Sequence, residues 1–289
     1  MRLATRRRFA WLAVLSPPLI WTLLFMIVPY TIMFAYSFFR KEGFSFIPDL
    51  QFGNYAALLL DPQYSQVLLR TLKIATMVSL AALILAYPLA YFLAFKVRWA
   101  RLRLFLYMAV IVPLWVSYLL RAYTWKTILG SEGVLNSFLV WSGILSEPTH
   151  LFLYNQFAMV LTLTYIFIPF MVMPIYTALE KIPRSLIEVS GDLGVGPSHT
   201  FFRVTLPLSV PGILAGFTFT FCLAFGDFIA PALVGGPTGT MVANVVQSQF
   251  GVSFNWPLGG AISIVMLAIV LTIISISDRF ERAGRLDLG

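Results

Sequence analysis

The residues with the clearest potential for chemistry are few, and their spacing limits what the chain can do. They are Glu188, Asp192 and Arg203 in one polar stretch, Asp227 in an apolar run, and the widely separated His150, His199 and Cys222. A membrane enzyme would need convergent His, Asp or Cys side chains, and a nucleotide-hydrolysing chain would need a G-x-x-x-x-G-K-[ST] phosphate loop. The sequence contains neither pattern, so it predicts no catalytic site and no cofactor or metal site in this chain.

Asp227 is the one carboxylate embedded well within an apolar segment. A charge at the bilayer centre costs about 2.5–3.5 kcal/mol on insertion scales, so such residues usually face protein or water. An ideal helix rises about 28 Å from Leu208 to Asp227, which places the carboxylate toward one end of its segment, and Pro231 should disturb the helix there. We expect Asp227, flanked by Phe225 and Phe228, either to attract an organic cation in a solute pathway or to be satisfied by water or a partner subunit.

The polar stretch Glu188–Pro207, EVSGDLGVGPSHTFFRVTLP, separates two long apolar segments. Pro183 suits a first helical position, and a helix from Arg184 to Leu193 would place Leu186, Ser190 and Leu193 on one face. Gly194 and Gly196 can take left-handed backbone angles after the last turn, and Pro197 can start a second short helix, which would end near Leu206-Pro207. The pattern predicts a helix–elbow–helix at a membrane surface.

Composition indicates a membrane protein. The chain is 59% hydrophobic and 11% charged, against about 45–50% and 25% in soluble proteins. Its single cysteine, Cys222, can form no disulfide within the chain and is interpreted as a core or lipid-facing residue. The net charge of +8 does not indicate nucleic-acid binding, because the basic residues flank apolar spans.

Six apolar runs are each close to the length of about 17–25 residues that a membrane-spanning helix requires. They are Phe9–Ser37, Ile74–Phe95, Leu104–Leu120, Phe157–Ala178, Leu208–Val234 and Leu258–Ser277. The first run is too long for a cleaved secretory signal, so we interpret it as a span. The predicted organisation is therefore an all-α membrane protein with a basic N-terminus (residues 1–8), a six-span domain (residues 9–277) containing a polar loop (residues 179–207), and a C-terminal tail (residues 278–289).

The basic residues predict which way the spans are oriented. One side of the predicted membrane carries most of the 20, namely Arg2, Arg6, Arg7, Arg8, Lys96, Arg98, Arg101, Arg103, Lys181, Arg184, Arg203, Arg279, Arg282 and Arg285. The positive-inside rule places this side, with both termini and the Glu188–Pro207 stretch, in the cytoplasm. The other side carries Arg40, Lys41, Arg70, Lys73, Arg121 and Lys126. Its loops should contain short helices at Val134–Trp141 and Met241–Phe250.

The polar stretch resembles the coupling loop of the permease subunits of binding-protein-dependent ABC importers. That family has Glu-Ala-Ala, three residues, Gly, nine residues, Ile, one residue and Leu-Pro. Here the matching positions are Glu188, Val189, Ser190, Gly194, Val204, Leu206 and Pro207, with small-residue departures at the alanines and Val for Ile. The resemblance implies that the loop docks on a cytoplasmic ATPase dimer, which binds ATP and Mg. An ordinary cytoplasmic connector is the alternative.

Other segments narrow the resemblance. RAYTWKTILGSEGVLN, GDFIAPALVGGPTGTMVANVVQSQF and NWPLGGAIS resemble the spermidine/putrescine permease branch, so that the similarity covers most of Arg121–Ser263. It implies a bacterial inner-membrane heterodimer of two permeases, an ATPase dimer, a periplasmic binding protein and a small solute, with a polyamine favoured over other solutes. A secondary transporter is the alternative class, but it would normally show midplane ionisable groups or paired broken helices.

Overall fold

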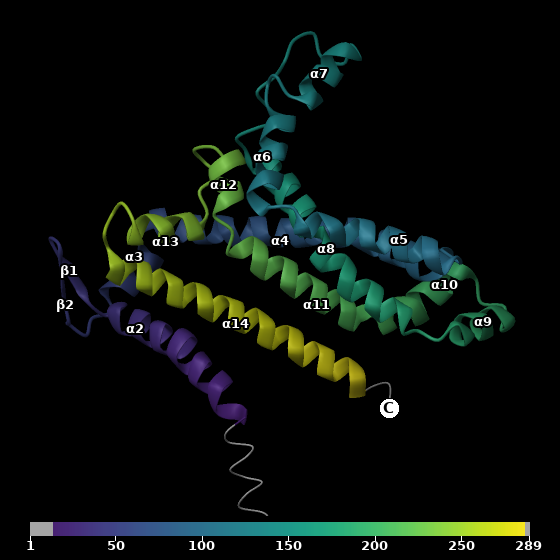
Figure 1. Ribbon diagram of the computed structural model, residues 1–289, viewed down its shortest axis with the longest axis horizontal. Helices are drawn as coiled ribbons and strands as arrows, with labels where there is room; N and C mark the ends of the chain where they lie inside the picture. Colours follow the sequence, from purple (N-terminus) through teal and green to yellow (C-terminus); the bar gives the residue numbers. More distant parts are fainter. Residues whose placement is uncertain (1–13, 287–289) are drawn as a thin grey trace, which may run out of the picture. The chain divides into compact units, whose positions relative to one another are not determined.

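The computed structural model describes residues 14–286, with side chains described for residues 14–280. The predicted basic N-terminus (residues 1–8) and the start of the first span lie outside the described residues. The chain divides into two compact units. Unit 1 contains the described residues up to Tyr64 together with Val246–Ala268. Unit 2 contains Ser65–Val245 and the chain from Ile269 onward. Figure 1 labels the elements along the chain.

Unit 1 begins with the apolar helix Val14–Tyr36, which contains the π-helical turn η1 (Leu23–Ile27) and α2 (Val28–Tyr36). A two-stranded antiparallel hairpin follows, formed by β1 (Arg40–Glu42) and β2 (Ser45–Ile47). Gly43 in its turn has φ +59°, a left-handed angle that glycine adopts without steric cost. Helix α3 (Gly53–Leu60) completes this part, and the start of α14 (Trp256–Leu286) belongs to the same unit. The hairpin was absent from the sequence prediction.

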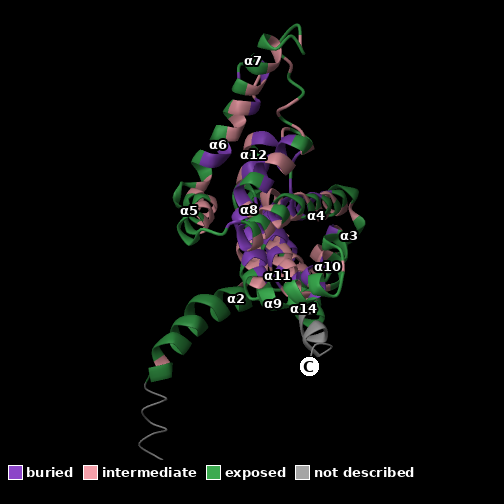
Figure 2. Ribbon diagram, turned by 90° about the vertical axis from the view of Figure 1, so that its right-hand side faces the viewer, coloured by how far each residue is buried: buried purple, intermediate pink, exposed green. Residues whose placement is uncertain are grey.

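Unit 2 is built around the helix pair α8 (Gln156–Glu180) and α11 (Leu206–Phe225), its most extensive helix contact. The pair packs closely because α11 presents two glycines one helical turn apart. A Cβ on Gly212 would lie 2.6 Å from both the Ala178 Cβ and the Pro174 carbonyl oxygen, and one on Gly216 would lie 2.9 Å from the Met171 sulfur. This small-xxx-small spacing lets two helix backbones approach inside a membrane. Buried residues concentrate on these helices in Figure 2.

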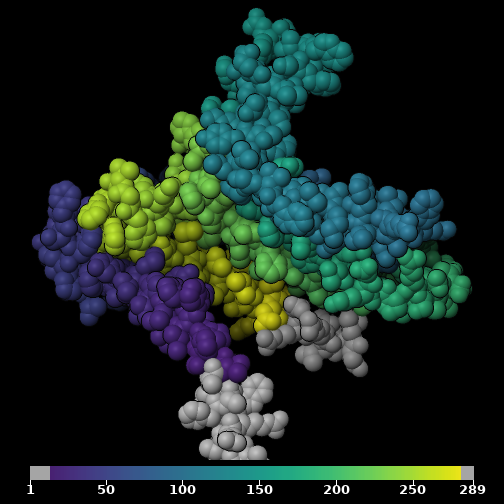
Figure 3. Space-filling view, viewed as in Figure 1, coloured from purple at the N-terminus to yellow at the C-terminus, as the bar shows by residue number. Residues whose placement is uncertain are grey.

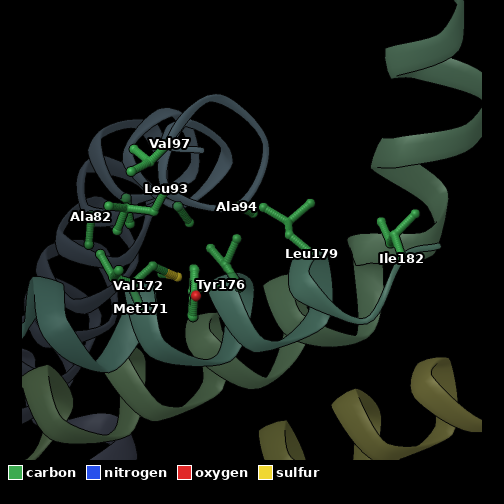
Figure 4. Packing of buried hydrophobic residues seen from close by; sticks show 12 residues of the cluster. Ala82, Leu93, Ala94, Val97, Met171, Val172, Tyr176, Leu179 and Ile182 are labelled. Carbon is green, nitrogen blue, oxygen red and sulfur yellow. The ribbon is translucent and has the colours of Figure 1, made fainter. Parts of the chain in front are cut away.

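Helix α4 (Pro62–Tyr91), extended by the π-helical turn η2 (Phe92–Lys96), contributes a second layer to unit 2. Its alanines Ala82, Ala86 and Ala90 recur every four residues and are fully buried. They belong to one cluster with Met171 and Ile175 of α8. Figure 4 shows how side chains of the two segments meet in this cluster. The core therefore combines small residues on one helix with larger ones on its neighbour.

Unit 2 contains several further, mostly shorter elements. They are α5 (Ala100–Ile111), the 3-10 turn η3 (Val112–Trp115), α6 (Tyr118–Leu129), α7 (Val134–Trp141), α9 (Arg184–Asp192), α10 (Pro197–Thr200), the π-helical turn η4 (Phe201–Thr205), α12 (Ile229–Val234) and α13 (Val242–Phe250), the last of which crosses into unit 1. The short helix predicted at Val134–Trp141 is confirmed, and the one predicted at Met241–Phe250 begins at Val242.

Among the described residues, five helices are long and apolar enough to cross a membrane, or six if one bent pair counts as a span. The five are Val14–Tyr36, Pro62–Lys96, Gln156–Glu180, Pro197–Phe225 and Trp256–Phe280. The predicted all-α membrane fold is thus confirmed, with one short hairpin as its only strands among the described residues. The helix α14 continues to Leu286, so most of the predicted C-terminal tail is helical.

Two predicted spans require correction. Leu104–Leu120 is not one helix, because Ala100–Trp115 and Tyr118–Trp141 meet at 96°. Pro113 lies in the 3-10 turn and Val116 is extended (ψ 137°), which ends the α-helical hydrogen bonding before Ser117. Leu208–Val234 is also wrong as one span, because the helix begins at Pro197 and ends at Phe225, before Pro231.

Candidate functional site

The polar loop folds as a helix, a glycine elbow and a second helix, as its sequence predicts. Helix α9 begins at Arg184, directly after Pro183, which occupies the capping position rather than the first helical one. Gly194 has φ +75°, and its N–H donates to the Gly191 carbonyl at 2.9 Å. The Val195 N–H donates to the Ser190 carbonyl at 3.1 Å. These two bonds form the Schellman arrangement, which needs a left-handed residue after the helix.

The second half of the loop differs from its prediction in two respects. Gly196 has φ −64°, so it is not left-handed, because the single reversal at Gly194 already turns the chain. Helix α10 begins at Pro197 as predicted but does not end near Leu206-Pro207. It continues through η4 into α11, where the wider turn accommodates Pro207, which has no N–H to donate. The helix from Pro197 to Phe225 is therefore unbroken.

A buried hydroxyl pair fastens the two helices of the loop together. The Ser190 Oγ and Thr200 Oγ1 atoms are 2.8 Å apart, and both side chains are buried. A neutral hydrogen bond of this kind contributes about 0.5–1.5 kcal/mol. Ser190 therefore faces α10. This contact and the Gly194 turn together fix the angle between α9 and α10.

The outer side of α9 carries exposed apolar residues. Leu186, Val189 and Leu193 are 44%, 54% and 76% exposed and follow one another at spacings of three and four. This spacing puts them on one helical face. The sequence prediction grouped Ser190 with Leu186 and Leu193 and omitted Val189, although the same spacing rule would have found it. Glu188 is exposed on α9, whereas Val204 and Leu206 are half-buried and Pro207 is exposed at the start of α11.

An open cavity of about 640 Å³ lies at the base of the loop in unit 2. It is lined by residues of α5, α8, α9 and α11, including Tyr107, Thr177, Lys181, Leu186 and Gly212. One side of α9 thus borders space rather than packed core. In Figure 3 the green surface that includes this loop lies at the right-hand edge, directly below the blue surface of α5.

Asp227 lies at the break between α11 and α12 and is buried. Its Oδ1 atom accepts the Ala230 N–H at 2.9 Å, which caps α12. Its Oδ2 atom accepts a hydrogen bond from the Tyr118 hydroxyl of α6. Both carboxylate oxygens thus have hydrogen-bond donors from this chain in this conformation. The sequence analysis had named water or a partner subunit as the groups that would satisfy a structural Asp227.

The two phenylalanines beside Asp227 have different environments. Phe225 is fully buried and stacks on Phe221 with ring centroids 5.7 Å apart. Phe228 is 40% exposed, and its carbonyl oxygen accepts the Asn244 side-chain amide at 2.7 Å. Only Phe228 of the pair presents a substantial surface next to the carboxylate.

Sequence reasoning missed Tyr118 and did not foresee the burial of Arg121. Arg121 was placed among the basic residues at the external end of the spans, and in the structure it is buried in α6, where its Nη1 atom donates to the Ile166 carbonyl at 3.2 Å. Its guanidinium carbon is 6.0 Å from the centre of the Tyr118 ring, within cation–π range. Tyr118 precedes Asp227 by 109 positions. No local spacing rule connects residues that far apart.

Comparisons with known proteins agree with this architecture. The family described as "Binding-protein-dependent transport system inner membrane component" matches residues 62–283. The spermidine/putrescine transport system permease protein PotB of Escherichia coli (strain K12) is 38% identical over 270 residues, covering 92% of this chain and 94% of that protein. The inner membrane ABC transporter permease protein YdcU of the same organism is 38% identical over 246 residues, covering 81% and 78%.

A solved structure has the same fold. A chain of a bacterial alginate ABC transporter, in complex with alginate pentasaccharide-bound periplasmic protein, matches with a TM-score of 0.80 and 19% identity over 98% of this chain and 97% of that chain. The family inferred from the Glu188–Pro207 motif is therefore confirmed. This chain belongs to the inner-membrane components of binding-protein-dependent transport systems.

Proposed function

We propose that this chain is one of two permease subunits of an ATP-driven importer, and that its solute is a polyamine, putrescine or spermidine. The observation that carries this proposal is the 38% identity to PotB over 92% of the chain. The partners would be a second, homologous permease, a cytoplasmic ATPase dimer that binds ATP and Mg, and a periplasmic binding protein. This chain would perform no bond chemistry of its own.

The geometry of the polar loop supports ATPase coupling. Leu186, Val189 and Leu193 form an exposed apolar stripe, which an ATPase groove would bury. The Gly194 turn and the Ser190–Thr200 hydroxyl pair hold the loop as one rigid piece. Motion of the ATPase would then be transmitted to α11 through the unbroken helix that begins at Pro197. In this proposal Glu188, Val204, Leu206 and Pro207 belong to the same coupling element.

The proposed orientation places the loop and both termini in the cytoplasm. The excess of Lys and Arg on that side supports it. The number of spans is even if the bent pair Ala100–Trp115 and Tyr118–Trp141 counts as one. An even number of spans puts both ends of the chain on the same side.

For the solute pathway we propose that Asp227 attracts the ammonium groups of the polyamine, with Phe228 offering an aromatic face and Phe225 supporting it from the core. In the present conformation the Tyr118 hydroxyl occupies Oδ2 of Asp227. An arriving ammonium group would compete with Tyr118 for this oxygen. The ammonium group carries a full positive charge, whereas the Tyr118 hydroxyl is a neutral donor, so coulombic attraction to the carboxylate favours the ammonium.

Uptake competition tests the solute class. In vesicles containing the whole transporter and its binding protein, uptake of labelled putrescine should be inhibited by excess unlabelled spermidine. An anionic solute such as a sugar phosphate should not inhibit putrescine uptake, because the Asp227 carboxylate would repel a negatively charged solute. Failure of labelled putrescine to enter, with ATP hydrolysis responding to another solute instead, would refute the polyamine assignment and leave the coupling proposal standing.

Asp227→Asn tests the pathway role. Asn keeps an oxygen that can cap α12 but removes the charge, so the transporter should assemble normally. A hydrogen bond to a charged group contributes about 1.5–3 kcal/mol, so the half-saturating putrescine concentration should rise about tenfold or more. Tyr118→Phe is the matched control, because it breaks the same contact but keeps the carboxylate, and its half-saturating concentration should not rise. Equal impairment in both variants would indicate a purely structural contact.

A further inference from the structure

The segment Phe38–Leu60 of unit 1 exposes large apolar side chains although it lies outside the candidate spans. Phe44, Leu50, Phe52, Leu59 and Leu60 are between 66% and 88% exposed. Helix α3 in this segment has eight residues, a length of about 12 Å that cannot cross a hydrocarbon core of about 30 Å. A loop in water would gain by burying such residues, so their exposure indicates a surface that contacts something apolar.

Helix α3 is tied to the end of the first apolar helix, which ends at Tyr36. The Asn54 side-chain amide donates to the carbonyl oxygens of Ser37 and Phe39, at 2.9 Å in both cases. The Tyr55 hydroxyl lies 2.7 Å from the Ser37 Oγ atom. Because Ser37 directly follows the span, these bonds hold the start of α3 at the level where the span leaves the hydrocarbon.

The hairpin is tied to the start of another span, which begins at Trp256. Phe46 stacks on Trp256 with ring centroids 6.0 Å apart. It also meets the Tyr36 ring edge-on, with the two ring centroids 5.9 Å apart. The Lys41 ammonium donates to the Ser253 carbonyl at 2.7 Å. Aromatic residues at the ends of spans mark the headgroup level of a membrane. The hairpin and α3 are therefore fixed to the same level by independent contacts.

The charged side chains of the segment have polar partners within unit 1. Arg40 pairs with Glu42 at 2.8 Å and approaches Asp49 at 4.0 Å, and Lys41 is held by the Ser253 carbonyl. Paired charges are less costly to bring near an apolar phase than isolated ones. The tip of the hairpin is Gly43-Phe44, with no charge on either side chain, and Phe44 contacts Phe254 with centroids 6.2 Å apart.

We propose that the segment Phe38–Leu60 is a lipid-binding anchor. Its hairpin tip at Phe44 and the Leu59-Leu60 end of α3 are immersed at the boundary between headgroups and acyl chains. This is the environment that interfacial amphipathic segments occupy. The proposal depends on the chain being a membrane protein and not on which solute it carries. Lipid is favoured over a protein partner because contacts to the ends of two spans set the depth of the segment.

Spin-label accessibility tests the anchor in the whole transporter, reconstituted in vesicles of phosphatidylethanolamine and phosphatidylglycerol. Labels would be placed at Phe44→Cys and Leu60→Cys in a Cys222→Ala background, with Glu147→Cys as the reference in an exposed loop. We expect both labels to shift from the reference toward more collisions with oxygen and fewer with the water-soluble nickel complex NiEDDA. Phe52→Cys supplies a further position if either variant fails to assemble.

Three results would overturn the anchor. Labels as accessible to NiEDDA as the Glu147 reference would mean that the segment lies in water. Labels shielded from both oxygen and NiEDDA would mean that protein covers it, as expected for the second permease. Shielding that appears only when the loaded binding protein is added would identify a docking surface for that protein.

Discussion

Gly194→Val should abolish solute-stimulated ATP hydrolysis and uptake while leaving the amount of transporter in the membrane unchanged. Gly194 has φ +75°, an angle that costs an L-residue about 1–2 kcal/mol and a β-branched residue more. Nothing lies within 4 Å of a Cβ at this position, so the effect comes from backbone strain and not from a clash. The strain would open the Schellman turn and displace α9 from its angle to α10. ATPase assays on the reconstituted complex measure the loss.

Gly196→Val is the matched control for this experiment. Gly196 lies two residues away, is equally open to a Cβ, and has φ −64°, which valine adopts without strain. This variant should show normal solute-stimulated ATP hydrolysis and uptake. Gly194→Asn should fall between the two, because Asn tolerates left-handed angles better than other non-glycine residues. Two results would contradict the proposal that the left-handed turn at Gly194 is needed for coupling. One is normal solute-stimulated ATP hydrolysis in Gly194→Val, and the other is an equal loss of this activity in Gly194→Val and Gly196→Val.

Gly212→Leu should prevent assembly of a stable transporter. Even a Cβ at this position would lie 2.6 Å from the Pro174 carbonyl oxygen, a backbone atom that cannot move without shifting α8. Overpacking a tight core costs about 1–3 kcal/mol and sometimes more, and the clash here is with the main chain. Gly212→Ala should therefore already lower the thermal unfolding midpoint. Size-exclusion profiles and unfolding midpoints in detergent measure both effects.

Val210→Leu provides the reference for the packing experiment. Val210 lies two residues earlier in α11 but is exposed, so the added methylene meets no neighbouring helix. Its unfolding midpoint should equal that of the parent protein. A stable, monodisperse Gly212→Leu protein would mean that α8 and α11 are not held together by this close approach.

The sequence predicted the elbow well where residue type restricts the backbone. Pro197 starts a helix and Gly194 reverses the chain because each residue favours that conformation locally. Gly196 does not take the left-handed angle that its residue type allows, since glycine permits such an angle without requiring it. The predicted span Leu104–Leu120 was wrong because hydropathy counts apolar residues and does not register the interruption at Pro113–Ser117.

Contacts between distant segments could not be predicted from local patterns. The Tyr118–Asp227 hydrogen bond depends on the 96° bend that brings α6 to the end of α11. The hairpin was missed because its strands have only three residues each, too few for alternation to stand out from a generally apolar sequence. The Gly212–Gly216 spacing is visible in the sequence, but only the structure shows that these glycines lie on the face of α11 that packs against α8.

The continuous helix from Pro197 to Phe225 sets the distance between the polar loop and the end of α11 next to Asp227. Its 29 residues make a rod about 43 Å long. A rotation of about 5° about one end would sweep the opposite end through an arc of about 4 Å over that length. Such an arc exceeds the length of a hydrogen bond, so a rotation of this size about the Pro197 end would separate the Asp227 carboxylate from the Tyr118 hydroxyl if α6 kept its position.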